Sequence, residues 1–314
     1  MSNLATRVLV AAVGIPLILL LTMAGGFYFS AFVALISTLA LHEFYAMARL
    51  KGGAPQAGPG LVIGLCVNGV FAFSRLRFVV VNFLDGRGIS VPTPSMTQAL
   101  LILLLLSFPL FFLIELFRNR GSALLNISLT ALGVMYVSLF FGCLIGLREL
   151  FVPEDFPVYA HFSAAGPSVP DHIARTIDQW GGKTLLAVFA SIWVCDSTAY
   201  FAGRGFGRHK LFERVSPNKT WEGAIAGCIG ALASFVLARE VALPYMTLGN
   251  ALVCGGIVGV FGQLGDLAES LLKRDAGVKD SSSLIPGHGG VLDRFDSILF
   301  VAPLLYCYLD FVVF

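Results

Sequence analysis

Pairs of acidic residues spaced three apart flank one polar stretch near the C-terminus. Asp266 and Glu269 precede the stretch, and Asp293 and Asp296 follow it. On a helix, residues three apart share a face, so each pair can direct its carboxylates the same way. A short polar connection between the two helices can bring the pairs together. Hard oxygen ligands suit Mg²⁺, which typically takes one or two carboxylates plus substrate phosphates.

The polar stretch also carries groups suited to binding phosphate. Gly287, Gly289 and Gly290 come just before an expected helix, where accessible backbone N–H groups and the positive end of the helix dipole favour anions. His288 lies among them and offers a further donor, although a lone loop histidine is as often merely hydrated. We predict that His288, Gly289 and Gly290 bind substrate.

Simple neutralisation is the alternative explanation for these acids. Lys273, Arg274 and Arg294 are close in sequence, and surface salt bridges to them would account for the carboxylates. However, near-cancelling charge gathered at one point of a nearly uncharged chain is costly and usually functional. We therefore favour a functional site.

Two charged residues upstream are further candidates. Asp196 lies well inside an expected membrane span, where a charge costs about 2.5–3.5 kcal/mol on insertion scales unless it faces a polar interior. The segment SPNKTWEG predicts a helix start, with Ser216 as N-cap and Pro217 at the first helical position. Lys219 would then lie beside a helix N-terminus, or would serve only as a positive-inside anchor.

Three other features are set aside. The sequence GGKT at 181–184 lacks the first glycine and the preceding strand of a P-loop, and GRGFGR at 203–208 lacks the strand of a dinucleotide fold. We interpret GRGFGR as a flexible turn at the end of a helix. His42 and Glu43 lie in an expected span, but position alone does not join them to the site, so we exclude them from the catalytic set.

Composition defines the class of protein. The 314 residues are 57% hydrophobic and only 13% charged, which no ordinary water-soluble domain of this length shows. Six cysteines are scattered singly without metal or disulfide spacing, and a net charge of +2 does not suggest nucleic acid as a partner.

Apolar windows predict an all-α polytopic membrane protein with about nine transmembrane helices, since about 20 apolar residues cross roughly 30 Å of hydrocarbon. Arg75 and Arg77 interrupt the third window, so eight or ten spans remain possible. The windows are 6–23, 27–48, 59–84, 98–117, 122–147, 184–202, 221–238, 248–271 and 291–313.

Charge distribution predicts orientation and organisation. A cytosolic N-terminus puts 14 of the 21 Lys and Arg residues on the cytosolic side, together with the polar loops 203–220 and 273–290. Residues 1–150 hold only four of the 19 acids. We therefore expect N-terminal transmembrane helices over 1–150, an extracytoplasmic connection over 151–183 and a catalytic transmembrane region over 184–314.

The C-terminal residues resemble the signature of the phosphatidate cytidylyltransferases, also called CDP-diacylglycerol synthases. The stretches DSTAYFAGRGFGRHK and SPNKTWEG are similar to further shared segments of that family, so the resemblance covers at least residues 191–296. The signature residues are Ser270, Leu272, Lys273, Arg274, Lys279, Asp280, Ser282, Ile285, Pro286, His288, Gly289, Gly290, Val291, Asp293, Arg294, Phe295 and Asp296.

The resemblance implies an all-helical membrane homodimer, with a polar cavity open to the cytosol and the bilayer. It implies CTP and phosphatidic acid as reactants, CDP-diacylglycerol and pyrophosphate as products, and Mg²⁺ as cofactor, in a bacterial-type inner membrane with the active site facing the cytoplasm. Carried over residue by residue, Asp266 and Asp293 are expected as catalytic metal ligands, with Asp196 and Asp296 close by in the substrate site.

The basic residues would bind phosphates, since Arg offers a planar fork and Lys a point charge. Lys273 either joins them or points toward lipid headgroups. Two rivals are a secondary transporter, which should show broken helices in matching halves, and a CTP-dependent lipid kinase. The predicted phosphate ligands are Lys219, Arg274 and Arg294, with Lys273 and Lys279 in the wider substrate site.

Overall fold

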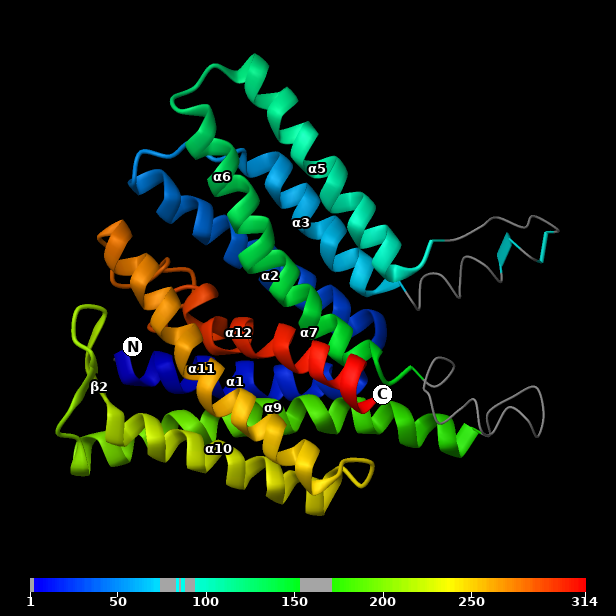
Figure 1. The fold of residues 1–314 in the computed structure, drawn as a ribbon, viewed down its shortest axis with the longest axis vertical. Helices are drawn as coiled ribbons and strands as arrows, with labels where there is room; N and C mark the ends of the chain where they lie inside the picture. Colours follow the sequence, from blue (N-terminus) through cyan, green and yellow to red (C-terminus); the bar gives the residue numbers. More distant parts are fainter. Residues whose placement is uncertain (1–2, 74–82, 85, 88–93, 153–170) are drawn as a thin grey trace.

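The computed structural model describes residues 3–73, 83–84, 86–87, 94–152 and 171–314 (Figure 1). These residues are almost entirely helical, apart from one two-stranded hairpin. The helices before the hairpin are α1 (Asn3–Ala24), α2 (Gly26–Leu50), α3 (Ala57–Phe71), α5 (Met96–Arg118), the continuous α6 (Ala123–Gly133), η1 (Val134–Leu139) and α7 (Phe140–Glu149), and α9 (Asp171–Phe206). After it come α10 (Trp221–Ala242), α11 (Leu248–Ala276), α12 (Leu292–Tyr308) and a π-helical end, η3 (Leu309–Val313).

Short polar residues begin several of these helices. The Ser95 hydroxyl accepts a hydrogen bond from the Gln98 backbone N–H, and the Gln98 side-chain oxygen accepts one from the Ser95 backbone N–H, which is a complete capping box for α5. Thr247 caps α11 in the same way by accepting from the Asn250 backbone at 3.2 Å. Gly277 ends α11 in the left-handed conformation, with φ of 74°, where a residue without a Cβ carries no steric cost.

The membrane-protein class is confirmed. Eight of the described helices are long and apolar enough to span a bilayer. The third predicted window, 59–84, corresponds to α3, which has only 15 residues. The remainder of that window falls largely on residues 74–82, outside the described part. The expected nine spans therefore resolve into eight long apolar helices and one shorter apolar helix.

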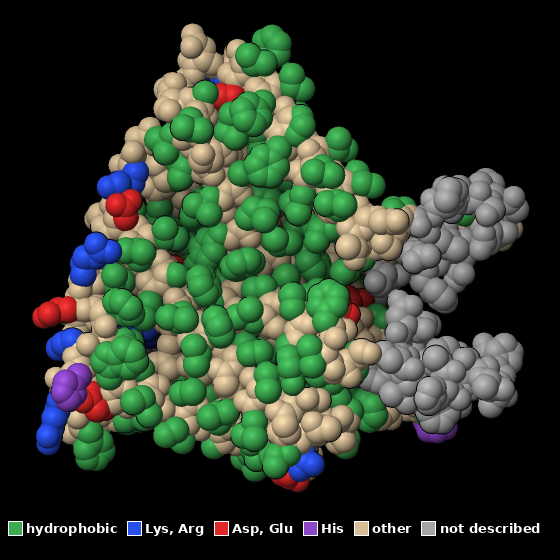
Figure 2. All heavy atoms as spheres, viewed as in Figure 1, with side chains coloured by type: hydrophobic (Ala, Val, Ile, Leu, Met, Phe, Trp, Pro, Cys, Tyr) green, Lys and Arg blue, Asp and Glu red, His purple; other side chains and the backbone are tan. Residues whose placement is uncertain are grey.

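The helices run between two ends of the molecule. The N-terminus, the hairpin and the segment between α11 and α12 lie at one end, and the C-terminus lies at the other (Figure 1). Figure 2 shows hydrophobic side chains over the broad middle of one face and most charged side chains along the edge where the hairpin lies. A membrane protein needs this distribution, because lipid contacts the middle and water the end.

The start of the sixth predicted span differs from the sequence prediction. The sixth span, expected from residue 184, belongs to a helix of 36 residues that starts at Asp171. Part of the predicted connection 151–183 is therefore helical, and its residues 153–170 lie outside the described ranges. Buried Arg148 contacts Asp178 at 3.0 Å, which ties this charged first part of α9 to the end of α7.

The predicted helix start at Ser216 is wrong. Ser216–Thr220 forms strand β2, which pairs with β1 (Lys210–Phe212) in an antiparallel hairpin. Pro217 is therefore in a strand, and Thr220 is the N-cap of α10, accepting from the Gly223 backbone at 3.2 Å. Pro–Asn after Ser is compatible with either conformation, and the pairing with β1 favours the extended one.

Helices α9, α10, α11 and α12 pack against one another next to the hairpin. Small residues allow the close approach: a Cβ on Gly255 of α11 would lie 2.8 Å from the Leu232 Cα of α10. Ser191 of α9 donates to the Ala231 carbonyl of α10 at 3.0 Å. Interhelical packing with small residues and hydrogen bonds is the main source of stability inside a membrane.

Replacing Gly255 with alanine should destabilise this packing, because a backbone atom of α10 occupies the space a methyl group needs. We expect a lower melting temperature in detergent, with a cost of about 1–3 kcal/mol typical of overpacking. Gly256→Ala is the matched control, since nothing lies within 4 Å of its Cβ position. Equal melting temperatures for the two variants would contradict the close approach of α10 and α11.

Candidate active site

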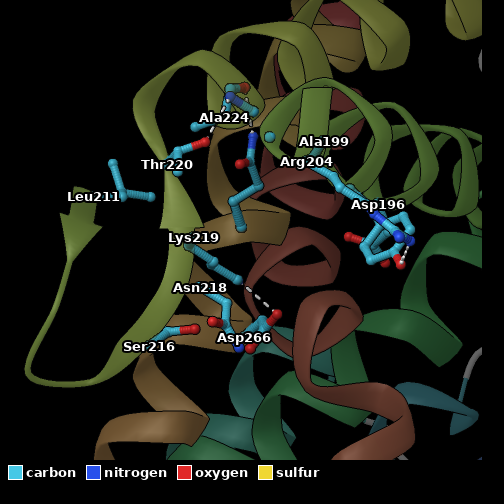
Figure 3. Close-up of a pocket in the computed structure, with 14 residues that line it drawn as sticks. Asp196, Ala199, Arg204, Leu211, Ser216, Asn218, Lys219, Thr220, Ala224 and Asp266 are labelled. Carbon is cyan, nitrogen blue, oxygen red and sulfur yellow. Dashed lines mark hydrogen bonds and ion pairs between the residues drawn. The ribbon is translucent and has the colours of Figure 1, made fainter. Parts of the chain in front are cut away.

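A pocket of about 540 Å³ lies between the hairpin and helices α9, α10 and α11 (Figure 3). We call it the hairpin pocket. Within it, Lys219 of β2 faces Asp266 of α11. Its lining consists of Asp196, Ala199, Tyr200, Gly203, Arg204, Leu211, Ser216, Asn218, Lys219, Thr220, Gly223, Ala224, Gln263 and Asp266.

The Lys219 ammonium donates to Asp266 Oδ2 at 2.6 Å, as the dashed line in Figure 3 marks. The Lys219 and Asp266 side chains are 27% and 34% exposed, so both can reach a ligand in the pocket. Ser270, one turn further along α11, donates to Asp266 Oδ1 at 3.2 Å. The hairpin therefore brings the Lys219 ammonium into contact with the Asp266 carboxylate, which lies on α11.

A second pocket, of about 610 Å³, adjoins the first. We call it the α1 pocket, because α1 supplies one of its walls. Asp196 and Asp266 line both pockets and form their common wall. The polar part of the α1 pocket comes from Asp196 of α9 and from α11, α12 and the segment between these two helices. Its polar residues are Asp196, Asp266, Lys273, Asp280, His288, Asp293, Arg294, Asp296 and Ser297.

The opposite wall of the α1 pocket is apolar. It is built from one face of α1 and one face of α9. The pocket thus has a charged floor and a side that matches hydrocarbon. The apolar residues from these two helices are Val10, Ala11, Gly14, Ile15, Ile18, Phe189, Ile192 and Trp193.

Lys273 is turned into the protein and not toward a membrane surface. Its ammonium contacts Glu269 Oε2 at 2.5 Å and Asp293 Oδ1 at 2.7 Å. The Lys273 side chain is 13% exposed, that of Asp293 3% and that of Glu269 0%. One largely buried cation thus joins α11 to α12, and because Lys273 also lines the α1 pocket, its place in the wider substrate site stays a prediction.

Asp293 also organises the segment between these helices. Its Oδ2 accepts from the Ser281 backbone at 2.9 Å, the Ser281 hydroxyl at 2.9 Å and the Gly290 backbone at 2.7 Å. The Gly290 N–H is therefore already used within the protein. Asp293 can bind a metal ion only by giving up part of its contact with Lys273.

Glu43 of α2 is a residue that the sequence analysis set aside and the structure brings to the site. It is 3% exposed and accepts from the hydroxyls of Ser281 at 2.9 Å and Ser282 at 2.6 Å. It also accepts from the backbone of Val291 at 3.0 Å and Leu292 at 2.8 Å, at the start of α12. Carboxylates favour such helix N-termini. The sequence did contain one signal for Glu43: an ionisable residue within an expected membrane span usually has a functional role.

The remaining predicted residues divide into two groups. Lys279, His288, Gly289 and Arg294 border a further pocket beside the α1 pocket. Arg274 is exposed and lines none of these three pockets, and its Nε donates to the Val215 carbonyl in the hairpin at 3.5 Å.

The acids at the common wall suit a hard cation. Asp196, Asp266 and Asp296 all line the α1 pocket, so their carboxylates border one cavity. Within the described ranges, no three His, Cys, Asp or Glu side chains form a complete metal site. One or two carboxylates completed by substrate phosphates would be sufficient for Mg²⁺, so the donor set fits that ion.

The chain matches the model of the cytidylyltransferase family over residues 5–312. It is 38% identical over 309 residues to the phosphatidate cytidylyltransferase of Synechocystis sp., covering 96% of this chain and 94% of that protein. It is 33% identical over 310 residues to the phosphatidate cytidylyltransferase of Bacillus subtilis, covering 98% and 97%. A phosphatidate cytidylyltransferase of Brucella abortus is 44% identical over 150 residues, 48% of this chain and 54% of the relative.

The fold and the two joined pockets thus belong to a membrane-embedded nucleotidyltransferase. The chain is a member of the cytidylyltransferase family, as the signature between residues 270 and 296 predicted. The match also includes the N-terminal helices, in which the sequence analysis found only hydrophobicity in common.

Proposed function

We propose that this enzyme transfers the cytidylyl group of CTP to phosphatidic acid, forming CDP-diacylglycerol and releasing pyrophosphate. The names of its relatives supply the substrate class. One observation carries the proposal for this chain: two adjoining pockets share the wall formed by Asp196 and Asp266. A transferase needs that arrangement to bring two unlike reactants to a common point.

The hairpin pocket, with the Lys219–Asp266 pair, suits the nucleotide, and the α1 pocket suits the lipid. Lys219, Arg204 and Asn218 offer donors in the first pocket. The apolar wall of α1 and α9 fits acyl chains, while Arg294 and His288 offer donors for a headgroup phosphate. Cations lower the repulsion between two anionic reactants, and holding both in one geometry removes much of the entropic barrier.

The reaction requires little proton transfer. A phosphate oxygen of phosphatidic acid forms a bond to the α-phosphorus of CTP, and the bond from that phosphorus to the β-bridging oxygen breaks in line. The bridging oxygen leaves with pyrophosphate and retains its electron pair. Lys219 is placed to bind phosphate oxygens as the negative charge moves toward the leaving group.

We further propose Mg²⁺ as cofactor, held by Asp266 and Asp293 together with substrate phosphates, with Asp196 and Asp296 nearby. When bound, the ion supplies charge neutralisation for the transferred phosphoryl group. Lys219 and Lys273 pair with these carboxylates in the structure. The two lysines orient these carboxylates and offset their negative charge.

We also propose that the enzyme is a homodimer in a bacterial-type inner membrane, with both pockets reached from the cytoplasm. The excess of Lys and Arg at the hairpin end supports this orientation. The dimer is an expectation from the family resemblance, and size measurement of the detergent-solubilised protein by light scattering tests it. A monomeric mass for active protein would contradict it.

Isotope placement tests the proposed reaction. CTP labelled at the α-phosphorus should transfer label to lipid in amounts equal to the pyrophosphate released, while γ-label should leave with pyrophosphate. A lipid kinase would transfer the γ-label, and a transporter would attach neither label covalently. Appearance of γ-label in lipid would overturn the cytidylyltransferase proposal.

Replacing Asp266 with asparagine tests the metal assignment. The amide keeps the shape but lacks the ligand charge, so we expect kcat/KM to fall roughly 100-fold, as for loss of one preorganised electrostatic group. Asp275→Asn is the control, because Asp275 lies on the same helix, is 65% exposed and pairs with Lys51 at the surface. Wild-type turnover of Asp266→Asn at saturating Mg²⁺ would remove Asp266 from the metal site.

Single cysteines in a cysteine-free background test the orientation. Asn218→Cys in the hairpin and Ser283→Cys before α12 should be protected from membrane-impermeant thiol reagents in intact cells, since both positions are exposed at the end assigned to the cytosol. Pro244→Cys, between α10 and α11 at the opposite end, should react. The reverse labelling pattern would refute a cytoplasmic site.

A further inference from the structure

A cationic pocket opens beside the α1 pocket. Its volume is about 560 Å³, and it brings Arg7 of α1 together with Lys279 and Arg294. We call it the Arg7 pocket. It shares Asp280, His288, Ile285 and Arg294 with the α1 pocket, so the two are continuous. The N-terminal helices carry few charges, and nothing in the sequence had connected Arg7 with the signature.

The charges of the Arg7 pocket are unbalanced. Three permanent cations face a single acid, Asp280. In the described part of the chain, no ion pair or hydrogen bond involves the side chain of Arg7, Lys279 or Arg294. His288 has a buried Nδ1 that also lacks a hydrogen-bond partner among the described residues. Like charges around a shared space repel one another, and an anion bound between them relieves that repulsion.

The chemistry of these groups selects phosphate. Two guanidinium groups offer planar forks that match the oxygens of a phosphate, and Lys279 adds a point charge. A phosphomonoester or a pyrophosphate carries enough negative charge to offset most of the excess. The pocket is also lined mainly by polar atoms, unlike the apolar wall of the α1 pocket.

The periodicity of α1 supports an amphiphilic ligand. Arg7 precedes Val10 and Ala11 by three and four residues and Gly14 by seven, so these residues share one helical face. Val10, Ala11 and Gly14 line the α1 pocket. The face therefore carries a cation at the polar end and small apolar residues toward the middle of the membrane. A lipid with a phosphate headgroup has the same order of charge and hydrocarbon.

We propose that Arg7, Lys279 and Arg294, with His288, form an anion-binding vestibule for a phosphate group at the mouth of the α1 pocket. The phosphate belongs to an entering lipid phosphomonoester or to the released pyrophosphate. Arg7 is the member of this group that lies outside the family signature between residues 270 and 296. This inference rests on the proposed function for its two ligands, while the binding itself is independent of turnover.

Arg7→Ala and Arg7→Lys test the vestibule against Arg49→Ala. Arg49 is exposed at the same end of the molecule and does not line the Arg7 pocket, so Arg49→Ala controls for general surface charge. KM for phosphatidic acid in mixed micelles and Ki for inorganic pyrophosphate are measured for each variant. Arg7→Ala should change one of them about tenfold, the effect of losing one charge-assisted contact.

A higher KM for phosphatidic acid identifies the lipid headgroup, and a higher Ki for pyrophosphate identifies the leaving group. Arg7→Lys should lie between Arg7→Ala and wild type, because lysine retains the charge without the fork. KM for CTP should stay at the wild-type value. Unchanged KM and Ki in Arg7→Ala, or an equal effect of Arg49→Ala, would overturn the proposal.

Direct binding measurements test the anion-binding vestibule separately from the proposed transfer reaction. Titration of purified protein with short-chain phosphatidic acid and with pyrophosphate, in the absence of CTP, should show weaker binding of one of them by Arg7→Ala. If wild-type protein binds these anions through Arg7 but transfers no α-label from CTP, the vestibule stands and the proposed reaction fails. If α-label transfer occurs and Arg7→Ala binds both anions as wild type does, the vestibule fails alone.

Discussion

The geometry of the site depends on one buried cation. The Lys273 ammonium lies between Glu269 on its own helix and Asp293 on α12, at 2.5 and 2.7 Å. Neutralising or removing this lysine would leave two buried carboxylates without compensation, a situation that usually costs several kcal/mol. The contact fixes α12 relative to α11, and with it the positions of Asp266, Asp293 and Asp296. The polar segment between the helices is then held by Asp293 from one side and Glu43 from the other.

Charge in this protein is concentrated where hydrocarbon meets water. Asp196 and Asp266 lie between the hairpin pocket and the α1 pocket, which has an apolar wall. Carboxylates are expensive within a membrane, but these two line cavities, and Asp266 pairs with Lys219. Lining a cavity lowers the cost of placing these acids within the membrane, and it also makes their carboxylates accessible to ligands. Stability and function therefore impose the same requirement on these side chains.

The sequence predicted the class of fold and the residues of the polar segment, because long apolar runs and clustered charges are local signals. It misplaced the start of α10, since SPNKT forms a strand only by pairing with β1. It also missed Glu43, whose partners lie more than 230 residues away, with separations of 238 to Ser281 and 239 to Ser282. Contacts between distant segments leave no periodic trace in a single chain, so Glu43 was indistinguishable from any other acid in a span.

The contacts of Glu43 also indicate that the C-terminal half of the chain, which carries the family signature, depends on the N-terminal helices for its structure. A fragment beginning after α7 would keep every residue of the signature but would lose the acceptor for the Val291 and Leu292 N–H groups and for two serine hydroxyls. It would also lose the α1 wall of the second pocket. Insertion of the later helices without the earlier ones would thus yield an unsatisfied helix start in a site open to lipid. During biosynthesis, the polar segment can reach its final conformation only after α2, made much earlier, docks against it.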